Sequence, residues 1–273
     1  MKIFERFVKV AAVIGIILAV LILLTPLFLF TGHPVCYGLV ALRSRIYLWQ
    51  NYPELDVGLD GITYDFKHGG YYADYSSPTS IDTHFWLLCD GWGNVAVDRA
   101  DTIDQNTISR IAQNYRDAYD TAIEAADFSF EVHVNFCQIT HQYGNELSSI
   151  NKDFGISQEE VDKLVLDGDY DFREFAAKYG RITFYCFDSE VTVERAAEIL
   201  LELKAYLDEQ NIPFRGIEFI LQDQPGTDEY VHLVDIFYEE ICEEGLVERV
   251  TEYNDALHAH YEKLNQARKQ YRP

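Results

Sequence analysis

The sequence predicts an α+β protein: an N-terminal transmembrane helix followed by a mixed β-sheet packed with helices, as a two-layer α/β sandwich. Three observations predict it. An uncharged apolar run opens the chain, turn residues separate four short strand-like runs over 61–98, and strand and helix patterns alternate after residue 104. The expected segments are a cytoplasmic N-terminus at 1–9, a transmembrane helix at 10–30, a helical neck and linker at 31–60, and an acidic extracytoplasmic α+β domain at 61–273.

The transmembrane prediction depends on the apolar run over residues 11–30, which contains no charged side chain. A helix of this length spans about 30 Å, the thickness of a hydrocarbon core. A helix in the core of a soluble domain would have a polar face, and this run has none. The run is also longer than the apolar part of a cleaved signal peptide. Lys2, Arg6 and Lys9 precede it, which favours a cytoplasmic N-terminus and a body outside the cell membrane.

The charge balance excludes one class of partner. The chain has 45 acidic and 22 basic residues, a net charge of −23, and residues 31–273 hold 44 acids and 19 bases, a net charge of −25. Such a body would repel the phosphates of nucleic acids, so no nucleic-acid partner is expected. Apolar residues make up 48% of the chain, which is too many for a disordered protein.

A helical neck is expected over residues 36–51, ending before Pro53. Apolar residues recur there at three- and four-residue spacing, at Leu39, Leu42, Ile46 and Trp49. Two placements are open for the aromatic side chains of the neck. Rings at the outer lipid interface and rings packed against the body are both consistent with the positions of Tyr37, Tyr47 and Trp49.

Two β-hairpins are expected next. Strands at 61–66 and 71–76 flank Gly69-Gly70, and strands at 84–89 and 94–98 flank Asp90-Gly91. Glycine in these turns supplies positive φ at low steric cost. The four strands are therefore predicted to be antiparallel.

From residue 104 onward the patterns alternate between helix and strand. Residues 128–136 alternate strictly, with Phe128, Val132 and Phe136 on one face, and Ser157 with Glu160 forms a capping box. Helical connections of this length usually join parallel strands. The expected helices are 104–126, 157–167, 169–179, 192–210 and 228–270, the last interrupted at Gly245, and the remaining expected strands are 128–136, 181–187 and 216–221.

Motifs that carry chemistry are weak. The five cysteines form no C-x-x-C pair and are interpreted as small buried side chains. Residues 167–171 begin like a calcium loop, but Phe172 occupies the glycine position. The residue types needed for a cysteine nucleophile, its base and an orienting group occur close together, at Cys137, His133, His141 and Asn145. Closeness in sequence is weak evidence for a site, because successive residues of a strand point to opposite faces. No catalytic residue, metal site or cofactor is predicted.

The candidate ligand-binding residues lie in an aromatic cluster within the hairpins. They are Tyr71, Asp74, Tyr75, Trp86 and Trp92. Flat rings beside hydrogen-bonding side chains suit a glycan or peptide ligand. Cross-strand packing of the same rings is the alternative, and it is the favoured one.

The expected function is that of a single-pass membrane-anchored protein, whose acidic extracytoplasmic domain is a non-catalytic binding or scaffolding module for a protein or glycan partner. Catalysis is not the favoured expectation. Two alternatives stay open: an anchored hydrolase whose site is assembled only in three dimensions from residues such as His133, His141 and Asp74, and a surface protein that self-associates through an apolar stripe over 246–264.

Overall fold

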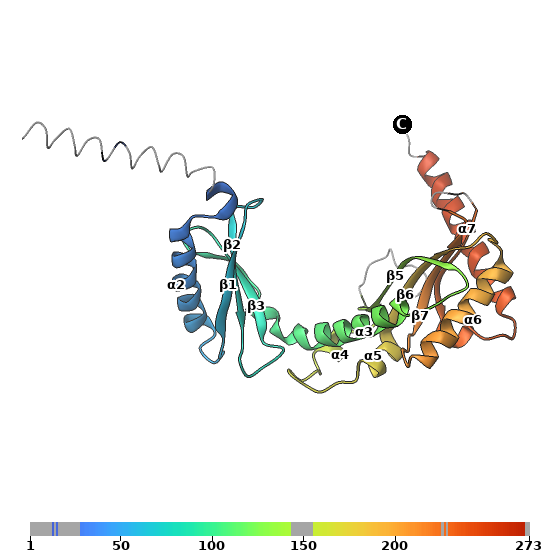
Figure 1. Ribbon diagram of the computed structural model, residues 1–273, viewed down its shortest axis with the longest axis horizontal. Coiled ribbons are helices and arrows are strands. Elements are labelled where there is room, and N and C mark those ends of the chain that lie inside the picture. The colour runs from blue at the N-terminus through green and yellow to red at the C-terminus, as the bar shows by residue number, and fades with distance from the viewer. Residues whose placement is uncertain are drawn as a thin grey trace, which may run out of the picture. The chain divides into compact units, whose positions relative to one another are not determined.

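The computed structural model describes residues 28–142, 155–224, 227 and 229–270, together with Val13 and Gly15. The chain forms two compact units (Figure 1). Unit 1 runs to Asn106 and includes Val165–Asp167, and unit 2 contains Thr107–Leu164 and the chain from Gly168 onward. The fold is α+β, as predicted, with two four-stranded sheets packed with helices.

Most of the predicted transmembrane segment, residues 10–30, lies outside the described residues, which include only Val13, Gly15 and residues 28–30 of it. Within the part of the chain that the structure describes, no helix combines the length and the apolar character needed to cross a bilayer.

Unit 1 pairs one long helix with an antiparallel sheet. Helix α2 is followed by four strands in the order β1-β2-β3-β4, which confirms both predicted hairpins. Gly69 and Gly93 have φ of 71° and 82°, so the turns use the positive φ expected of glycine. The elements are α2 (Pro34–Asn51), β1 (Gly58–Asp65), β2 (Gly70–Ser76), β3 (His84–Cys89), β4 (Val95–Asp98) and η1 (Ala100–Gln105).

One face of this sheet packs against α2. Val40 and Leu48 of the helix are buried with Tyr75 and Leu87 of the sheet. The Ser44 hydroxyl lies 2.6 Å from the Tyr75 hydroxyl. The predicted neck helix is therefore confirmed as a helix, and its inner side is part of the core of unit 1.

Unit 2 has the sheet order β5-β6-β7-β8, in which only β6 and β7 are parallel. Helix α6 makes the connection between these two parallel strands. The elements are α3 (Asn106–Glu124), β5 (Glu131–Ile139), α4 (Gln158–Val161), α5 (Phe172–Tyr179), β6 (Gly180–Phe187), α6 (Val193–Glu209), β7 (Gly216–Gln222), β8 (Tyr230–Phe237), η2 (Tyr238–Glu240) and α7 (Leu246–Gln270).

Helices α3 and α6 and the N-terminal part of α7 pack on one face of the sheet of unit 2. Phe184 and Phe219 from the central strands are fully buried in one cluster with Ile111 of α3, Leu203 of α6 and Val250 of α7. Because side chains alternate along a strand, the other face carries the intervening residues. We call this other side of the second sheet the open face.

Three sequence predictions are corrected by the structure. A single mixed sheet was expected, but the hairpins and the later strands form two separate sheets. Residues 228–270 were expected to be helical with an interruption at Gly245, but Tyr230–Phe237 is the edge strand β8. The interruption is confirmed, because α7 begins after Gly245, whose φ is 69°. Tyr230–Phe237 contains β-branched residues, and its pairing with β7 along its whole length makes it a strand.

The third correction concerns the strict alternation predicted for 128–136. The pairing of β5 with β6 shifts between Val132 and Val134, so His133 is an extra residue in a β-bulge. Beyond the bulge the faces exchange. Cys137 is buried in the core, and Phe136, predicted to lie on the buried face, is 43% exposed.

Candidate functional site

A group of polar side chains gathers on the open face of unit 2. Three neighbouring strands supply it, and most of its members are largely buried. We call it the polar cluster; its members are Arg181, Thr183 and Tyr185 of β6, Glu218 of β7, and His232 and Asp235 of β8.

Glu218 lies at the centre of the polar cluster. Its Oε2 accepts a hydrogen bond from the Arg181 guanidinium at 3.1 Å, and Oε1 lies 3.4 Å from Nε2 of His232. The hydroxyl groups of Tyr185 and Thr183 donate to the same carboxylate at 3.4 and 3.5 Å. The side chain of Glu218 is only 18% exposed, so these four groups replace most of its hydration.

Arg181 joins two strands through two carboxylates. In addition to Glu218 it contacts Asp235, with Nε 2.6 Å from Oδ1. A planar guanidinium suits such an arrangement because its donors point in fixed directions. The ion pairs therefore fix how β6, β7 and β8 present their side chains on the open face.

The surroundings set the charge of Glu218. The hydrogen bond from His232 lowers its pKa, burial opposes this, and the charge of Arg181 and the Tyr185 hydroxyl lower the pKa further, so that the net shift is downward. Burial raises the pKa of Tyr185, and the negative charge of Glu218 adds to that effect. Glu218 is thus ionised at neutral pH and Tyr185 keeps its proton.

A second bulge shapes the cluster. Ile217 pairs with Ile236 and Phe219 with Leu233, so that Val234 and Asp235 together oppose Glu218. Asp235 has φ of 54°, a left-handed conformation that aspartate tolerates better than most residues. Bulges of this kind often redirect a side chain beside a functional site.

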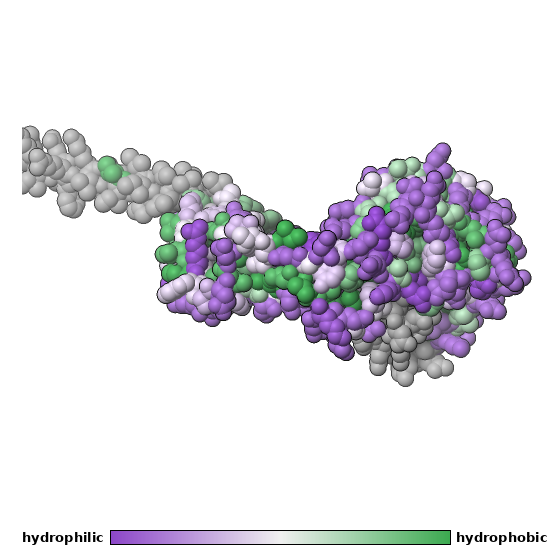
Figure 2. All heavy atoms as spheres, turned by 90° about the horizontal axis from the view of Figure 1, so that it is seen from below, coloured by the Kyte–Doolittle hydropathy of each residue, from purple (hydrophilic) through white to green (hydrophobic). Residues whose placement is uncertain are grey.

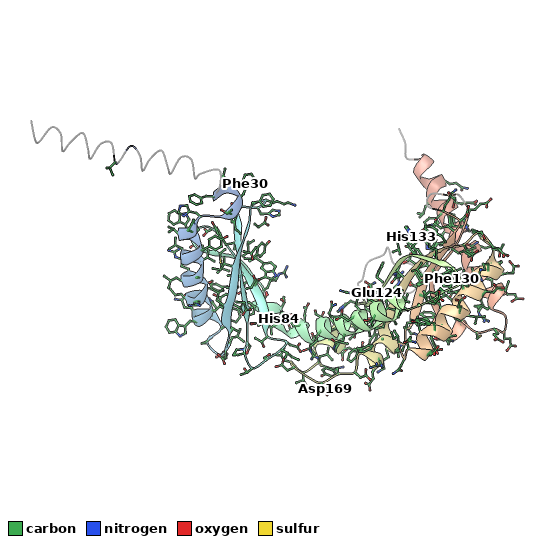
Figure 3. The ribbon with its side chains drawn as sticks, in the orientation of Figure 1. Phe30, His84, Glu124, Phe130, His133 and Asp169 are labelled. Carbon is green, nitrogen blue, oxygen red and sulfur yellow. The ribbon has the colours of Figure 1, made fainter. Side chains whose placement is uncertain are left out.

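Aromatic and aliphatic side chains surround the polar cluster. Phe136 is exposed, the rings of His133 and Phe187 lie with centroids 4.5 Å apart, and Val134 and Ile220 are half-buried (Figure 3 labels His133). The open face thus combines ordered charges with apolar surface. The hydroxyl groups of Thr183 and Tyr185 both donate to Glu218, and Thr183 is buried.

No three His, Cys, Asp or Glu side chains among the described residues are grouped so that they could hold a metal ion. All five cysteines are described and carry free thiols, and Cys89, Cys137 and Cys186 are buried. Burial raises the pKa of the Cys89 thiol to about 11 and that of Cys186 to about 12.

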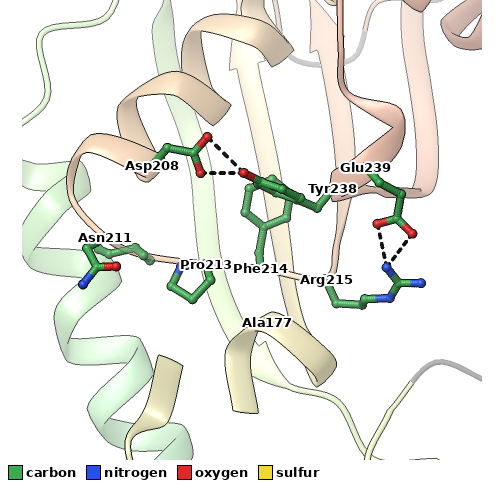
Figure 4. A pocket seen from close by; sticks show the side chains of 9 residues that line it. Ala177, Asp208, Asn211, Pro213, Phe214, Arg215, Tyr238 and Glu239 are labelled. Atoms are coloured by element: carbon green, nitrogen blue, oxygen red, sulfur yellow. Dashed lines mark hydrogen bonds and ion pairs between the residues drawn. The ribbon is translucent and has the colours of Figure 1, made fainter. Parts of the chain in front are cut away.

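A pocket of about 350 Å³ lies elsewhere in unit 2 (Figure 4). The Tyr238 hydroxyl donates to both carboxylate oxygens of Asp208, at 3.0 and 3.1 Å, and Arg215 donates to both oxygens of Glu239 at 2.6 Å. Burial alone would raise the pKa of Glu239, but the bond from Arg215 brings it below its ordinary value. The charged side chains of this pocket are therefore directed at each other.

The aromatic residues predicted to bind a ligand are divided between the two faces of the first sheet. Tyr71 and Tyr75 are buried on the side of α2. Asp74 and Trp86 are directly paired on the opposite side, and Trp92, in the turn after β3, is 71% exposed. Burial, with a smaller contribution from Asp60, raises the pKa of Asp74.

The other candidates are dispersed too. His141 forms a bridge with Ile156, Cys137 is in the core, and Asn145 lies outside the described residues. The apolar stripe proposed for self-association is largely buried in its own chain, at Leu246, Val250 and Leu257, with only Tyr261 and Leu264 substantially exposed. That buried portion cannot serve as a partner surface.

Sequence reasoning missed the polar cluster because it placed His232 and Asp235 in a helix. One signal was present: Arg181, Thr183 and Tyr185 alternate with the buried residues of the strand predicted at 181–187. That alternation indicates a polar second face, but not the residues of neighbouring strands that meet it.

Comparison with known proteins gives one similarity. Residues 120–251, slightly less than half of the chain, match the model of a family described as YfjL-like C-terminal domain. The matched range includes all four strands of the second sheet and every member of the polar cluster. Neither the curated proteins nor the solved structures contain a match to the chain.

Proposed function

We propose that this chain is a single-pass protein of the cell membrane, with its N-terminus in the cytoplasm and an acidic α+β body outside, and that the body binds a protein partner without catalysis. The contact surface is the open face of unit 2. The observation that carries the anchor is the run of twenty uncharged residues at 11–30, preceded by three basic residues.

Support for a binding surface comes from the composition of the open face. Protein interfaces are enriched in aromatic residues and arginine, and their strongest contacts cluster near the centre. Phe136, Tyr185 and Phe187 provide aromatic surface on the same face of the sheet as Arg181. The ion pairs hold these groups in place before any partner arrives, which lowers the entropy cost of binding.

Topology is tested by protease treatment of spheroplasted cells that carry the full chain. We expect the body to be digested and a short N-terminal fragment to stay protected. Protection of the whole chain, with digestion only after the membrane is lysed, would show that the body faces the cytoplasm.

Binding is tested with a photo-crosslinking amino acid placed at Phe136, and in a control chain at Ile81, which is 67% exposed in unit 1. We expect one cell-surface protein to be captured from position 136 and not from position 81. Phe136→Ser should then weaken the affinity for that purified protein by about 1–2 kcal/mol, roughly 5- to 30-fold, and Ile81→Ser should leave it unchanged. Equal capture from both positions contradicts the proposal.

A further inference from the structure

Helix α2 exposes apolar side chains on the side that faces away from its sheet. In a helix of a soluble domain this side is normally polar. Here the inner side is already occupied by Val40 and Leu48, which are buried against the sheet. The outer side, which we call the α2 outer face, carries four large apolar residues: Val35 (62% exposed), Leu42 (58%), Ile46 (43%) and Trp49 (74%).

Their spacing of seven, four and three residues places them along one stripe of the helix. Figure 2 shows hydrophobic side chains gathered on unit 1, whereas the visible surface of unit 2 is mostly hydrophilic. Single exposed apolar residues need no explanation, but a continuous stripe marks a surface that contacts a protein or a membrane.

The position of α2 in the chain favours the membrane. Only residues 31–33 separate Phe30, the end of the apolar run, from Pro34, the start of α2 (Figure 3 labels Phe30). Three residues span at most about 10 Å. The backbone N–H of His33 also donates to the Tyr71 hydroxyl at 3.0 Å, which ties this junction to the sheet of unit 1. Given the proposed anchor, α2 must therefore begin at the bilayer surface.

Charge supports the same placement. Residues 31–53, which follow the proposed anchor, contain no acid and two bases, whereas residues 54–273 contain 44 acids and 17 bases, a net charge of −27. These two bases, Arg43 and Arg45, both lie on α2 and are exposed, and Arg43 also donates to the Asn94 side chain at 2.8 Å. Basic side chains beside an apolar helix face are the features by which interfacial helices bind anionic lipid surfaces.

We infer that α2 lies on the outer surface of the membrane that holds the anchor, with the α2 outer face in the headgroup region. A second copy of the chain is the less favourable occupant, because it would bring two strongly acidic bodies and two Arg45 side chains together. The inference rests on the proposed anchor. It adds that unit 1 is attached to the bilayer through a helix face and not only through residues 10–30.

Tryptophan fluorescence tests this in the full chain, reconstituted in nanodiscs that contain anionic and brominated lipids. Trp86→Phe with Trp92→Phe leaves Trp49 as the reporter. In the control, Ile81→Trp is added to a chain in which all three tryptophans are replaced by Phe, since residue 81 is exposed to a similar degree in the same unit. Because interfacial helices lie about 5–10 Å deep, brominated lipids should remove about half of the Trp49 emission and little of the emission from residue 81.

Adding Leu42→Ser and Ile46→Ser to the Trp49 reporter should reduce the quenching, since both side chains are exposed and their loss leaves the core unchanged. Retention of the chain in membranes at alkaline pH is measured in parallel. Retention without quenching of Trp49 overturns the inference and leaves the anchor intact, whereas release of the chain overturns the anchor as well. A third outcome is that neither aqueous acrylamide nor brominated lipid quenches the Trp49 fluorescence. This result would indicate that a protein covers the α2 outer face, and it also overturns the inference.

Discussion

Removal of the negative charge of Glu218 tests whether the polar cluster is organised as described. Glu218→Gln keeps the shape of the side chain and removes the charge that Arg181 and His232 face. A hydrogen bond to a charged group contributes about 1.5–3 kcal/mol. Arg181 keeps Asp235 as a partner at 2.6 Å, so its charge is not left isolated. We therefore expect the free energy of unfolding of unit 2 to fall by about 1–2 kcal/mol at pH 7.

The pH dependence of this loss has a definite sign. The pKa of Glu218 is lowered in the folded chain, by the bond from His232 first, against the effect of burial, and with the help of Arg181. The stability that its charge contributes is complete above the unfolded pKa of about 4.3 and is lost as the pH falls through the folded pKa. The difference between the wild type and Glu218→Gln should therefore shrink in acid, where the wild-type carboxyl is also neutral.

Urea unfolding in detergent, followed by far-UV circular dichroism, measures the change. The three tryptophans, Trp49, Trp86 and Trp92, all lie in unit 1, so their fluorescence follows that unit separately. Glu252→Gln, which removes the same charge from an exposed site on α7, should change stability by less than about 0.5 kcal/mol. An equal effect of both substitutions, or a Glu218→Gln loss that persists in acid, would refute the account of the polar cluster.

Three further outcomes follow from local geometry. Tyr179→Phe removes the hydroxyl whose hydrogen bond holds the pKa of Glu160 at about 2, so an NMR titration should show that pKa rising toward its ordinary value; an unchanged titration contradicts the contact. Leu203→Ala should cost unit 2 about 2–5 kcal/mol in a denaturation experiment, because the side chain is 1% exposed in the core, and a cost below 1 kcal/mol would contradict that packing. In the native chain an aromatic disulfide reagent should modify exposed Cys242 and leave Cys89, whose pKa burial raises to about 11, unmodified until unfolding; early modification of Cys89 would show that it is accessible.

The hairpins of unit 1 were predictable because their signals are local. Glycine at 69 and 93 adopts positive φ, and the apolar runs on each side read as strands without knowledge of the rest of the chain. The capping box at Ser157 and Glu160 forms for the same reason, although the helix it begins, α4, ends at Val161 and not near residue 167. Where a few adjacent residues decide the conformation, the sequence was sufficient.

Long-range pairing was not predictable in this way. β8 was expected to be helical, yet its pairing with β7 makes it a strand, and nothing in residues 230–237 alone decides between the two periods. The division into two sheets likewise depends on which strands meet in space. The polar cluster, which draws on β6, β7 and β8 together, was out of reach for the same reason.

Two bulges determine what the open face presents. A regular β5 would direct Phe136 to the core with Val132, and a regular β8 would place Asp235 on the same side as Leu233. The extra residue at His133 brings Phe136 to the open face instead, and the bulge at Val234 and Asp235 brings the Asp235 carboxylate to Arg181. Each bulge interrupts a ladder of hydrogen bonds, and the second also holds a non-glycine residue at positive φ. Both irregularities supply side chains to the same surface, which favours a function for that surface over one for the regular face beneath the helices.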